Sequence, residues 1–187
     1  MKKQFAIVLA AAAITISSSL AFAQMMRENP MVGGAAMYPN KTIVANALNS
    51  ADHTTLVAAV KAAGLVDTLN SKGPFTVFAP TNAAFEALPA GTVETLLKPE
   101  NKDALTKVLT YHVVAGKWDS KAIAKLIKQG NGQAKIKTVS GGWLIASMDG
   151  SNLILRDEKG GTSTVTIADV YQSNGVIHVV NAVLLPN

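Results

Sequence analysis

The sequence contains no cysteine, which excludes disulfide bonds and thiolate metal sites. Charged residues make up 16% of the chain, below the quarter or so that is usual in globular domains, and aromatic residues make up only 5%. Beyond residue 23, no charge-free stretch reaches the roughly 20 apolar residues that a membrane-spanning helix needs. We therefore expect no transmembrane segment there, and a domain whose stability comes from apolar packing.

A strong excess of charge is also missing. The chain carries a formal net charge of +5. Without Lys2 and Lys3, 15 basic and 12 acidic residues remain, which leaves +3. This weak and dispersed charge predicts no nucleic-acid partner.

The N-terminus has the pattern of a signal peptide. Lys2 and Lys3 precede an apolar run over residues 5–16, and three serines lead to the small-residue site Ala21-Phe22-Ala23. The run is too short to span a bilayer comfortably. We predict a signal peptide over residues 1–23, cleavage after Ala23, and a secreted or periplasmic protein. An uncleaved membrane anchor is the alternative.

Residues 24–39 predict a mobile or loosely draped leader, because they contain two prolines and a Gly-Gly pair without apolar periodicity. The leader is rich in methionine (Met25, Met26, Met31 and Met37). Thioethers can bind Cu(I), but the spacing is irregular and no histidine or cysteine assists. We therefore expect no metal site in the leader, and a single folded domain over residues 40–187.

Helical patterns come first along this domain, and strand patterns follow. Helices are expected over residues 41–48 after Asn40, up to Gly64, after Thr81, after Thr92, from Pro99 and from Ser120 to Gly130. Strands are expected over residues 75–79, 136–139, 143–148, 152–156, 164–168 and 176–185. The first and last of these strands are apolar on both faces, which is typical of central strands. Together the pattern predicts an α+β domain.

Three segments stand out, at residues 75–85, 109–114 and 174–186. The residues that characterise the first and third are Phe75, Thr76, Phe78, Pro80, Thr81, Asn82, Phe85, Asn174, Gly175, His178 and Asn181. In this order and spacing, the three segments closely resemble the fasciclin domain over about residues 40–186. The resemblance implies a wedge-shaped β-sandwich with helices packed against it, a role in extracellular adhesion and ligand binding, and no catalysis. The family often has Asp where Asn82 and Asn181 stand, so a role that needs an acid there does not carry over.

The second segment contains the dipeptide Tyr111-His112, which the resemblance links to cell-surface receptor binding in animal relatives. These residues are the candidate partner-binding site. If they lie on a strand, their side chains point to opposite faces, so we expect at least one of them to be structural. His178 shares a face with apolar residues and is expected in the core, hydrogen-bonded.

The sequence carries no nucleophile elbow, zinc-protease motif or phosphate-binding loop. We therefore expect no catalytic residue, no cofactor and no metal.

The favoured function is an exported, non-enzymatic adhesion or interaction domain that presents a surface to a protein, matrix or cell-surface ligand. The alternative is a periplasmic binder of a small molecule or lipid, with a cavity between the helices and the sheet. Trp118 and Trp143 are candidate interface anchors if they are exposed, although packing in the core or in a hairpin is the favoured explanation for both.

Overall fold

The computed structural model describes residues 29–187. The predicted signal peptide and residues 24–28 lie outside the described residues. The helices are α2 (Ile43–Ala47), η1 (Ala51–His53), α3 (Thr54–Ala63), α4 (Val66–Asn70), α5 (Asn82–Glu86), α6 (Thr92–Leu96), η2 (Pro99–Asn101), α7 (Lys102–Tyr111) and α8 (Ser120–Gln129). The strands are β1 (Met31–Val32), β2 (Ala35–Ala36), β3 (Phe75–Pro80), β4 (Val113–Ala115), β5 (Gln133–Lys137), β6 (Trp143–Asp149), β7 (Asn152–Arg156), β8 (Thr162–Gln172) and β9 (Gly175–Val180).

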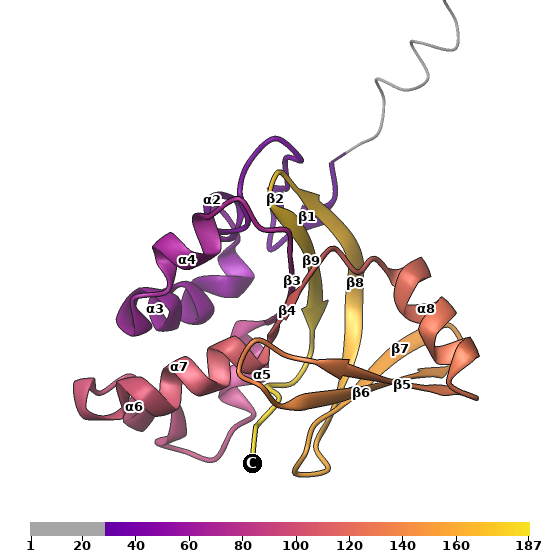
Figure 1. The fold of residues 1–187 in the computed structure, drawn as a ribbon. Helices are drawn as coiled ribbons and strands as arrows, with labels where there is room; N and C mark the ends of the chain where they lie inside the picture. Colours follow the sequence, from indigo (N-terminus) through magenta and orange to yellow (C-terminus); the bar gives the residue numbers. More distant parts are fainter. Residues whose placement is uncertain (1–28) are drawn as a thin grey trace, which may run out of the picture.

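Seven strands form one sheet in the order β4-β3-β9-β8-β7-β6-β5 (Figure 1). Only β3 and β9 pair in parallel, and the other neighbours are antiparallel. The long strand β8 is bulged between Val165 and Val170, and bulges bend a strand and increase its twist. The sheet therefore curls, and its two ends meet where the N–H of Val139 donates to the carbonyl of Val113 (2.8 Å).

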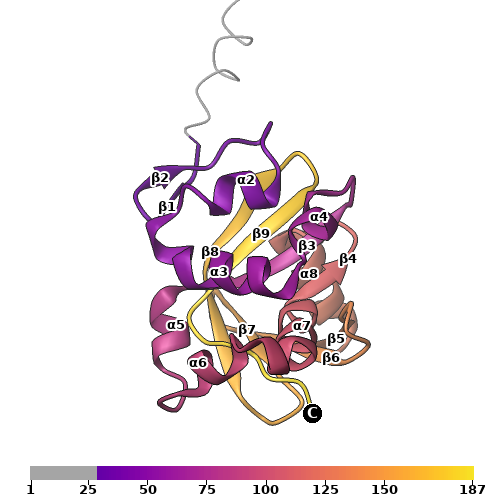
Figure 2. The same cartoon turned by 90° about the vertical axis from the view of Figure 1, so that its left-hand side faces the viewer.

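The curled sheet divides the interior into two cores. Helices α2 to α7 lie on the side of β3 and β9 (Figure 2), whereas α8 packs against β5 and β6. Side chains alternate along β3, so that Val77 and Ala79 enter the helical core and Phe78 enters the core beneath α8. The prediction that β3 is a central strand with two apolar faces is confirmed.

Several predicted boundaries shift by a few residues. Thr42, not Asn40, caps α2 by accepting the N–H of Ala45 (3.2 Å). Asp119 caps α8, which begins at Ser120. Gly64 ends α3 in the left-handed conformation, as predicted. The last strand, expected to reach residue 185, ends at Val180, and the chain then leaves the sheet while Leu184 stays buried.

The expectation of a loosely draped leader is wrong for residues 31–37. These residues form the β1–β2 hairpin, and Val32 and Met37 are only 4% and 2% exposed in the helical core. The carbonyl of Gly33, in a turn where φ is positive, accepts the N–H of Ala51 (3.2 Å). Strands of two residues are too short to show periodicity, so the sequence pattern could not reveal the hairpin.

Candidate functional site

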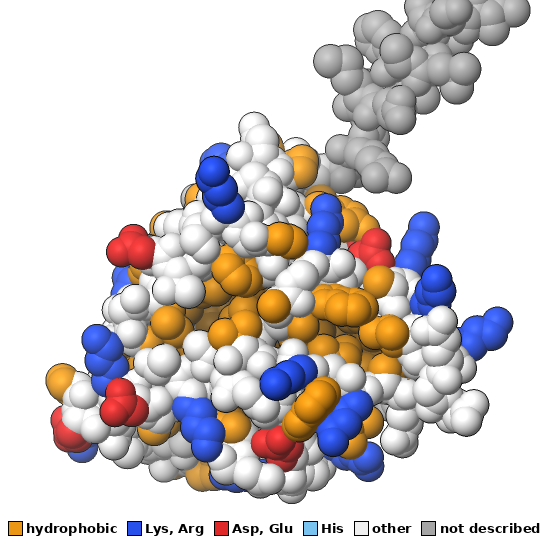
Figure 3. Space-filling model, in the orientation of Figure 1, with side chains coloured by type: hydrophobic (Ala, Val, Ile, Leu, Met, Phe, Trp, Pro, Cys, Tyr) orange, Lys and Arg blue, Asp and Glu red, His pale blue; other side chains and the backbone are white. Residues whose placement is uncertain are grey.

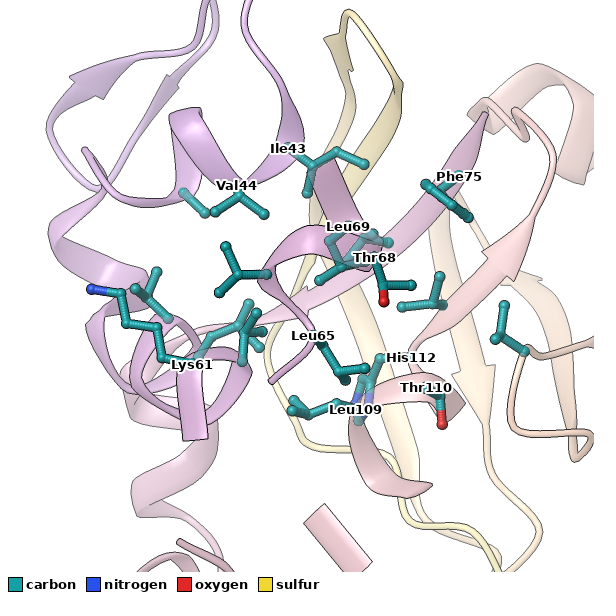
Figure 4. Close-up of a pocket in the computed structure, with 18 of the residues that line it drawn as sticks. Ile43, Val44, Lys61, Leu65, Thr68, Leu69, Phe75, Leu109, Thr110 and His112 are labelled. Atoms are coloured by element: carbon teal, nitrogen blue, oxygen red, sulfur yellow. The ribbon is translucent and has the colours of Figure 1, made fainter. Parts of the chain in front are cut away.

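An apolar cleft opens between the helical layer and strand β3 (Figure 4). We call it the apolar cleft and define it by the side chains that line it from α2, α3, α4, β3 and α7. They include Ile43, Val44, Val57, Val60, Leu65, Val66, Leu69, Phe75 and Leu109. The space-filling view shows hydrophobic side chains gathered in a hollow on this face of the molecule (Figure 3).

The periodicity of α3 explains one wall of the cleft. Val60 is buried on the inner face of the helix, whereas Val57 is only half-buried and borders the opening. The sequence pattern placed both valines on one helical face. Val57 and Val66 are half-buried, so each leaves part of an apolar side chain at the opening; the sequence shows that both are apolar but not that the fold leaves them partly uncovered.

The side chain of Asn174 holds the opposite wall in place. Its Oδ1 accepts the N–H of Ile43 (3.0 Å), and its Nδ2 donates to the carbonyls of Leu69 (2.7 Å) and Ser71 (2.9 Å). This buried amide thus ties α2 and the end of α4 to the turn between β8 and β9. Gly175 follows, and a Cβ at this position would overlap the carbonyl oxygen of Phe75. Two residues of the third sequence segment therefore frame the cleft.

The size of the cleft limits what it can hold. It offers about 70 Å³ to the centres of water-sized molecules. One water needs roughly 10–15 Å³ on that measure, so the space corresponds to roughly five to seven waters. This is room for a single bulky side chain or a small ring, and a long acyl chain is several times larger. Polar residues lie around the apolar walls, among them Lys61, Thr68 and Thr110.

Tyr111 and His112 do not lie on a strand, which was the case considered from the sequence. Tyr111 is the last residue of α7, and His112 is its C-cap. Both are buried, with exposures of 0% and 2%. Tyr111 Oη donates to the carbonyl of Trp143 (2.7 Å) and accepts the N–H of Glu158 (3.1 Å). Burial raises the pKa of Tyr111 to about 12. The pair therefore forms no exposed partner-binding patch, and only the His112 ring reaches the apolar cleft.

The hydrogen bonds of His112 fix its tautomer. Its Nδ1 lies 2.8 Å from the carbonyl of Val108, and its Nε2 lies 3.0 Å from the backbone nitrogen of Leu184. Because an amide N–H can only donate, Nε2 must accept and the proton must sit on Nδ1. Burial lowers the pKa of His112 to about 4, although the Val108 carbonyl opposes this shift. His112 is thus neutral near pH 7, with both nitrogens occupied by the backbone.

His178 is in the core, as predicted. Its Nδ1 accepts the N–H of Asp169 (3.3 Å), its Nε2 faces the carbonyl of Trp118 (2.8 Å), and its ring stacks on Phe78. Burial lowers the pKa of His178.

The third histidine, His53, is also buried. Its Nδ1 lies 2.8 Å from Ser50 Oγ, while its Nε2 has no hydrogen-bond partner. Burial lowers the pKa of His53 as well. Each of the three histidines is thus held inside the fold.

The first sequence segment supplies polar anchors. Thr76 Oγ1 donates to the carbonyl of Gly116 and accepts the N–H of Trp118, both at 2.8 Å. Thr81 caps α5, after the strand that ends at Pro80, and Phe85 is buried in the helical core.

The two positions where the family often has Asp differ in what the side chain does. Asn82 accepts the N–H of Thr55 (3.0 Å) and also donates to the carbonyl of Ala51 (2.8 Å), which a carboxylate could not do. Asn181 accepts the N–H of Thr164 (2.8 Å) through its Oδ1. Both the oxygen and the nitrogen of the side-chain amide therefore make hydrogen bonds at position 82, whereas position 181 needs only an acceptor.

Within residues 29–187, no group of three or more histidine, aspartate or glutamate side chains is placed to hold a metal ion. Met31 is exposed, but Met37 lies in the core and cannot serve a copper site in the leader. None of the described helices is both long and apolar enough to cross a membrane.

Trp143 is 37% exposed and Trp118 is half-buried, and both border a second groove beside α8.

Comparison with known proteins gives matches over most of the chain. A family model described as the fasciclin domain matches residues 51–186. Protein sll1483 of Synechocystis sp. is 47% identical over 174 residues, which cover 90% of this chain and 87% of that protein. The transforming growth factor-beta-induced protein ig-h3 of Sus scrofa is 40% identical over 131 residues, which cover 70% of this chain but 17% of that protein.

A solved structure has a similar fold. It is a FAS1 domain pair from the insect cell adhesion molecule Fasciclin I, with a TM-score of 0.70 and 18% identity. The match covers 79% of this chain and 51% of that chain. At this identity the likeness concerns the fold alone.

Proposed function

Because the chain belongs to the fasciclin domain family, as its three sequence segments predicted, we propose that it is an exported, non-enzymatic interaction domain that presents a surface to an extracellular or envelope partner. The predicted signal peptide supports export to the periplasm or the exterior. Membership of this family, which the sequence resemblance linked to extracellular adhesion, supports an adhesive role. The burial of all three histidines supports binding over acid–base catalysis.

The apolar cleft is the observation that carries this proposal. An apolar surface left open to solvent is costly, since each Å² removed from water is worth roughly 25 cal/mol. A partner that inserts one bulky apolar side chain removes this cost and gains contacts with Val44, Val60 and Leu65. Interfaces commonly gain most of their binding energy from such an anchor in a well-packed pocket.

A small apolar molecule is the second candidate for the same cleft. The volume supports a single ring or a short branched chain and argues against a long-chain lipid. The alternative predicted from the sequence is therefore narrowed to small apolar compounds.

A plugged variant tests the proposal. Val66→Trp places an indole at the half-buried edge of the cleft, whereas Met148→Trp adds the same group at an exposed position of β6 outside the cleft. Both variants should remain folded by circular dichroism. Partners captured from culture medium and envelope extract by the wild-type protein should persist with Met148→Trp and be lost with Val66→Trp. Equal capture by Val66→Trp would refute a role for the cleft.

The second candidate has its own readout. Purified protein is extracted with organic solvent, and the extract is examined by mass spectrometry. A compound released in stoichiometric amount by the wild type and absent from Val66→Trp favours the small molecule over a partner side chain.

A further inference from the structure

A second groove lies between β4, β5 and α8, and it meets the apolar cleft at Val139. We call it the basic groove and define it by Trp118, Leu126, Lys135, Lys137 and Trp143. At about 420 Å³ on the same measure, it is larger and more open than the cleft. Figure 3 shows hydrophobic side chains in a hollow beneath lysines on this part of the face. We propose that the basic groove binds an acidic polysaccharide, a partner chemistry that goes beyond the function proposed for the cleft.

Positive charge is concentrated in the segment that contributes Trp118, Leu126, Lys135 and Lys137 to this groove. Residues 117–137 contain six lysines and one acidic residue, Asp119. All six lysines are exposed, and none makes an ion pair within residues 29–187. Asp119 is already occupied as the cap of α8 and as an acceptor for Tyr171 Oη. The prediction of dispersed charge is therefore wrong locally, because the small net charge of the chain hides the six lysines within residues 117–137.

Two of these lysines lie over the ring of Trp143. Lys135 Nζ lies 4.7 Å and Lys137 Nζ lies 6.0 Å from the centroid of its ring, within the range of cation–π attraction. Glu158 bonds the backbone N–H of Trp143 (3.1 Å) and neither lysine. Two like charges held on one ring repel each other, and an anionic group of a ligand would relieve that repulsion.

Lys135 and Lys137 are the lysines that line the groove, whereas those of α8 lie outside it, and Lys121 borders another pocket beside β6, β7 and β8. Lys121, Lys125 and Lys128 follow at helical spacing on the solvent face of α8, while Ile123 and Ile127 are buried beneath them. Seven residues of helix rise about 10 Å, so the charge spans more than one anionic group. Lysines on an edge strand also oppose strand pairing, which can account for those of β5 but not for those of α8. The cluster therefore suits a linear polyanion.

The shape of the groove favours sugar rings over nucleobases and membranes. Lysines cover the ring of Trp143, and Trp118 is half-buried with its Nε1 bonded to the carbonyl of Ala115 (2.9 Å). The lysines over Trp143 and the partial burial of Trp118 reduce the ring surface open to the base stacking on which proteins that bind single-stranded nucleic acids rely. The aromatic side chains line a hollow and do not project toward a flat bilayer. Apolar walls from Val114 and Ile136 fit the C–H faces of pyranose rings, while the lysines fit uronate or sulfate groups.

Binding to alginate, a linear uronic acid polymer, tests the proposal by calorimetry at low ionic strength. The variant K135Q/K137Q removes two exposed charges at the groove. The matched control K72Q/K98Q removes two exposed lysines from other elements. Exposed ion pairs are individually weak, so we expect the groove variant to lose about five- to tenfold in affinity and the control less than about twofold. Neutral dextran should not bind.

Several outcomes would overturn the proposal. One is no alginate binding by the wild type, and another is an equal loss in both variants. Equal, lysine-dependent binding of single-stranded DNA or of phosphatidylglycerol vesicles would instead show a site for polyanions in general. The Val66→Trp variant should bind alginate normally, so failure of this inference and failure of the cleft proposal are distinguishable.

Discussion

The buried imidazole of His112 should make the domain lose stability in mild acid. In the unfolded chain its pKa is near 6.5, whereas burial lowers it to about 4 in the folded protein. Between these pH values the unfolded state binds a proton that the folded state does not. Stability therefore falls as the pH decreases from 6.5 and levels off, for this group, near 4. The contribution is fully present above pH 6.5.

The magnitude follows from the shift. One pKa unit corresponds to about 1.4 kcal/mol, so a move from 6.5 to about 4 removes about 3 kcal/mol. That is a large share of the roughly 5–15 kcal/mol of a typical domain. The hydrogen bond at Nε2 opposes protonation as burial does. Nε2 of the neutral ring accepts the N–H of Leu184, whereas a protonated Nε2 could not accept it. Burial also lowers the pKa values of His53 and His178, which act in the same direction.

Urea unfolding of the wild type and His112→Gln, at pH values from 7.5 to 4, measures this effect. The glutamine cannot titrate, and its amide oxygen can still accept from Leu184. We expect the variant to lose about 1–3 kcal/mol at pH 7, since the bond to Val108 is gone. As the pH falls from 6.5 to 4, the free energy of unfolding of the variant should decrease less steeply than that of the wild type, because the variant takes up about one proton fewer on unfolding. Identical pH dependence in both proteins would refute the reasoning.

The remaining predictions concern stability and are checked by thermal and urea unfolding. Asn174→Ala should cost about 3 kcal/mol or more, because it leaves the N–H of Ile43 and two carbonyls without their buried partner; a loss below 1 kcal/mol would contradict the framing role. Asn82→Asp should cost about 1–2 kcal/mol through the lost bond to Ala51, whereas Asn181→Asp should change stability by less than about 0.5 kcal/mol; the reverse order would count against the assignment. Met37→Ala should cost about 2–5 kcal/mol if the N-terminal hairpin is part of the core, and a neutral result would mean that it is not.

The sequence predicted the fold well where the pattern is long or repeated. β3 is apolar on both faces, and the helical spacing of Ile123 and Ile127 marks the buried face of α8. Both patterns arise because buried side chains are apolar, so a single sequence is enough to show them. The three sequence segments also predicted the family.

The candidate site was harder to predict, because it depends on contacts between distant residues. Asn174 bonds to Ile43 across 131 positions of the chain, and no local pattern reveals such a partner. For Tyr111 and His112 the sequence left the element open, since their apolar neighbours fit a strand or the end of a helix equally well. The lysine cluster is local, within residues 117–137, and was overlooked because only the net charge was considered, whereas the groove itself depends on the fold, which brings β4, β5, α8 and Trp143 together.

The central claim is that the cleft between the helical layer and β3 accepts an apolar group of a partner. Methyl NMR of the isoleucine, leucine and valine residues during a titration with toluene tests it most directly. We expect saturable shifts confined to methyl groups that line the cleft, such as those of Val44, Val60 and Leu65. No shifts, or shifts that fall equally on Leu144 and Leu155 in the core beneath α8, would contradict it.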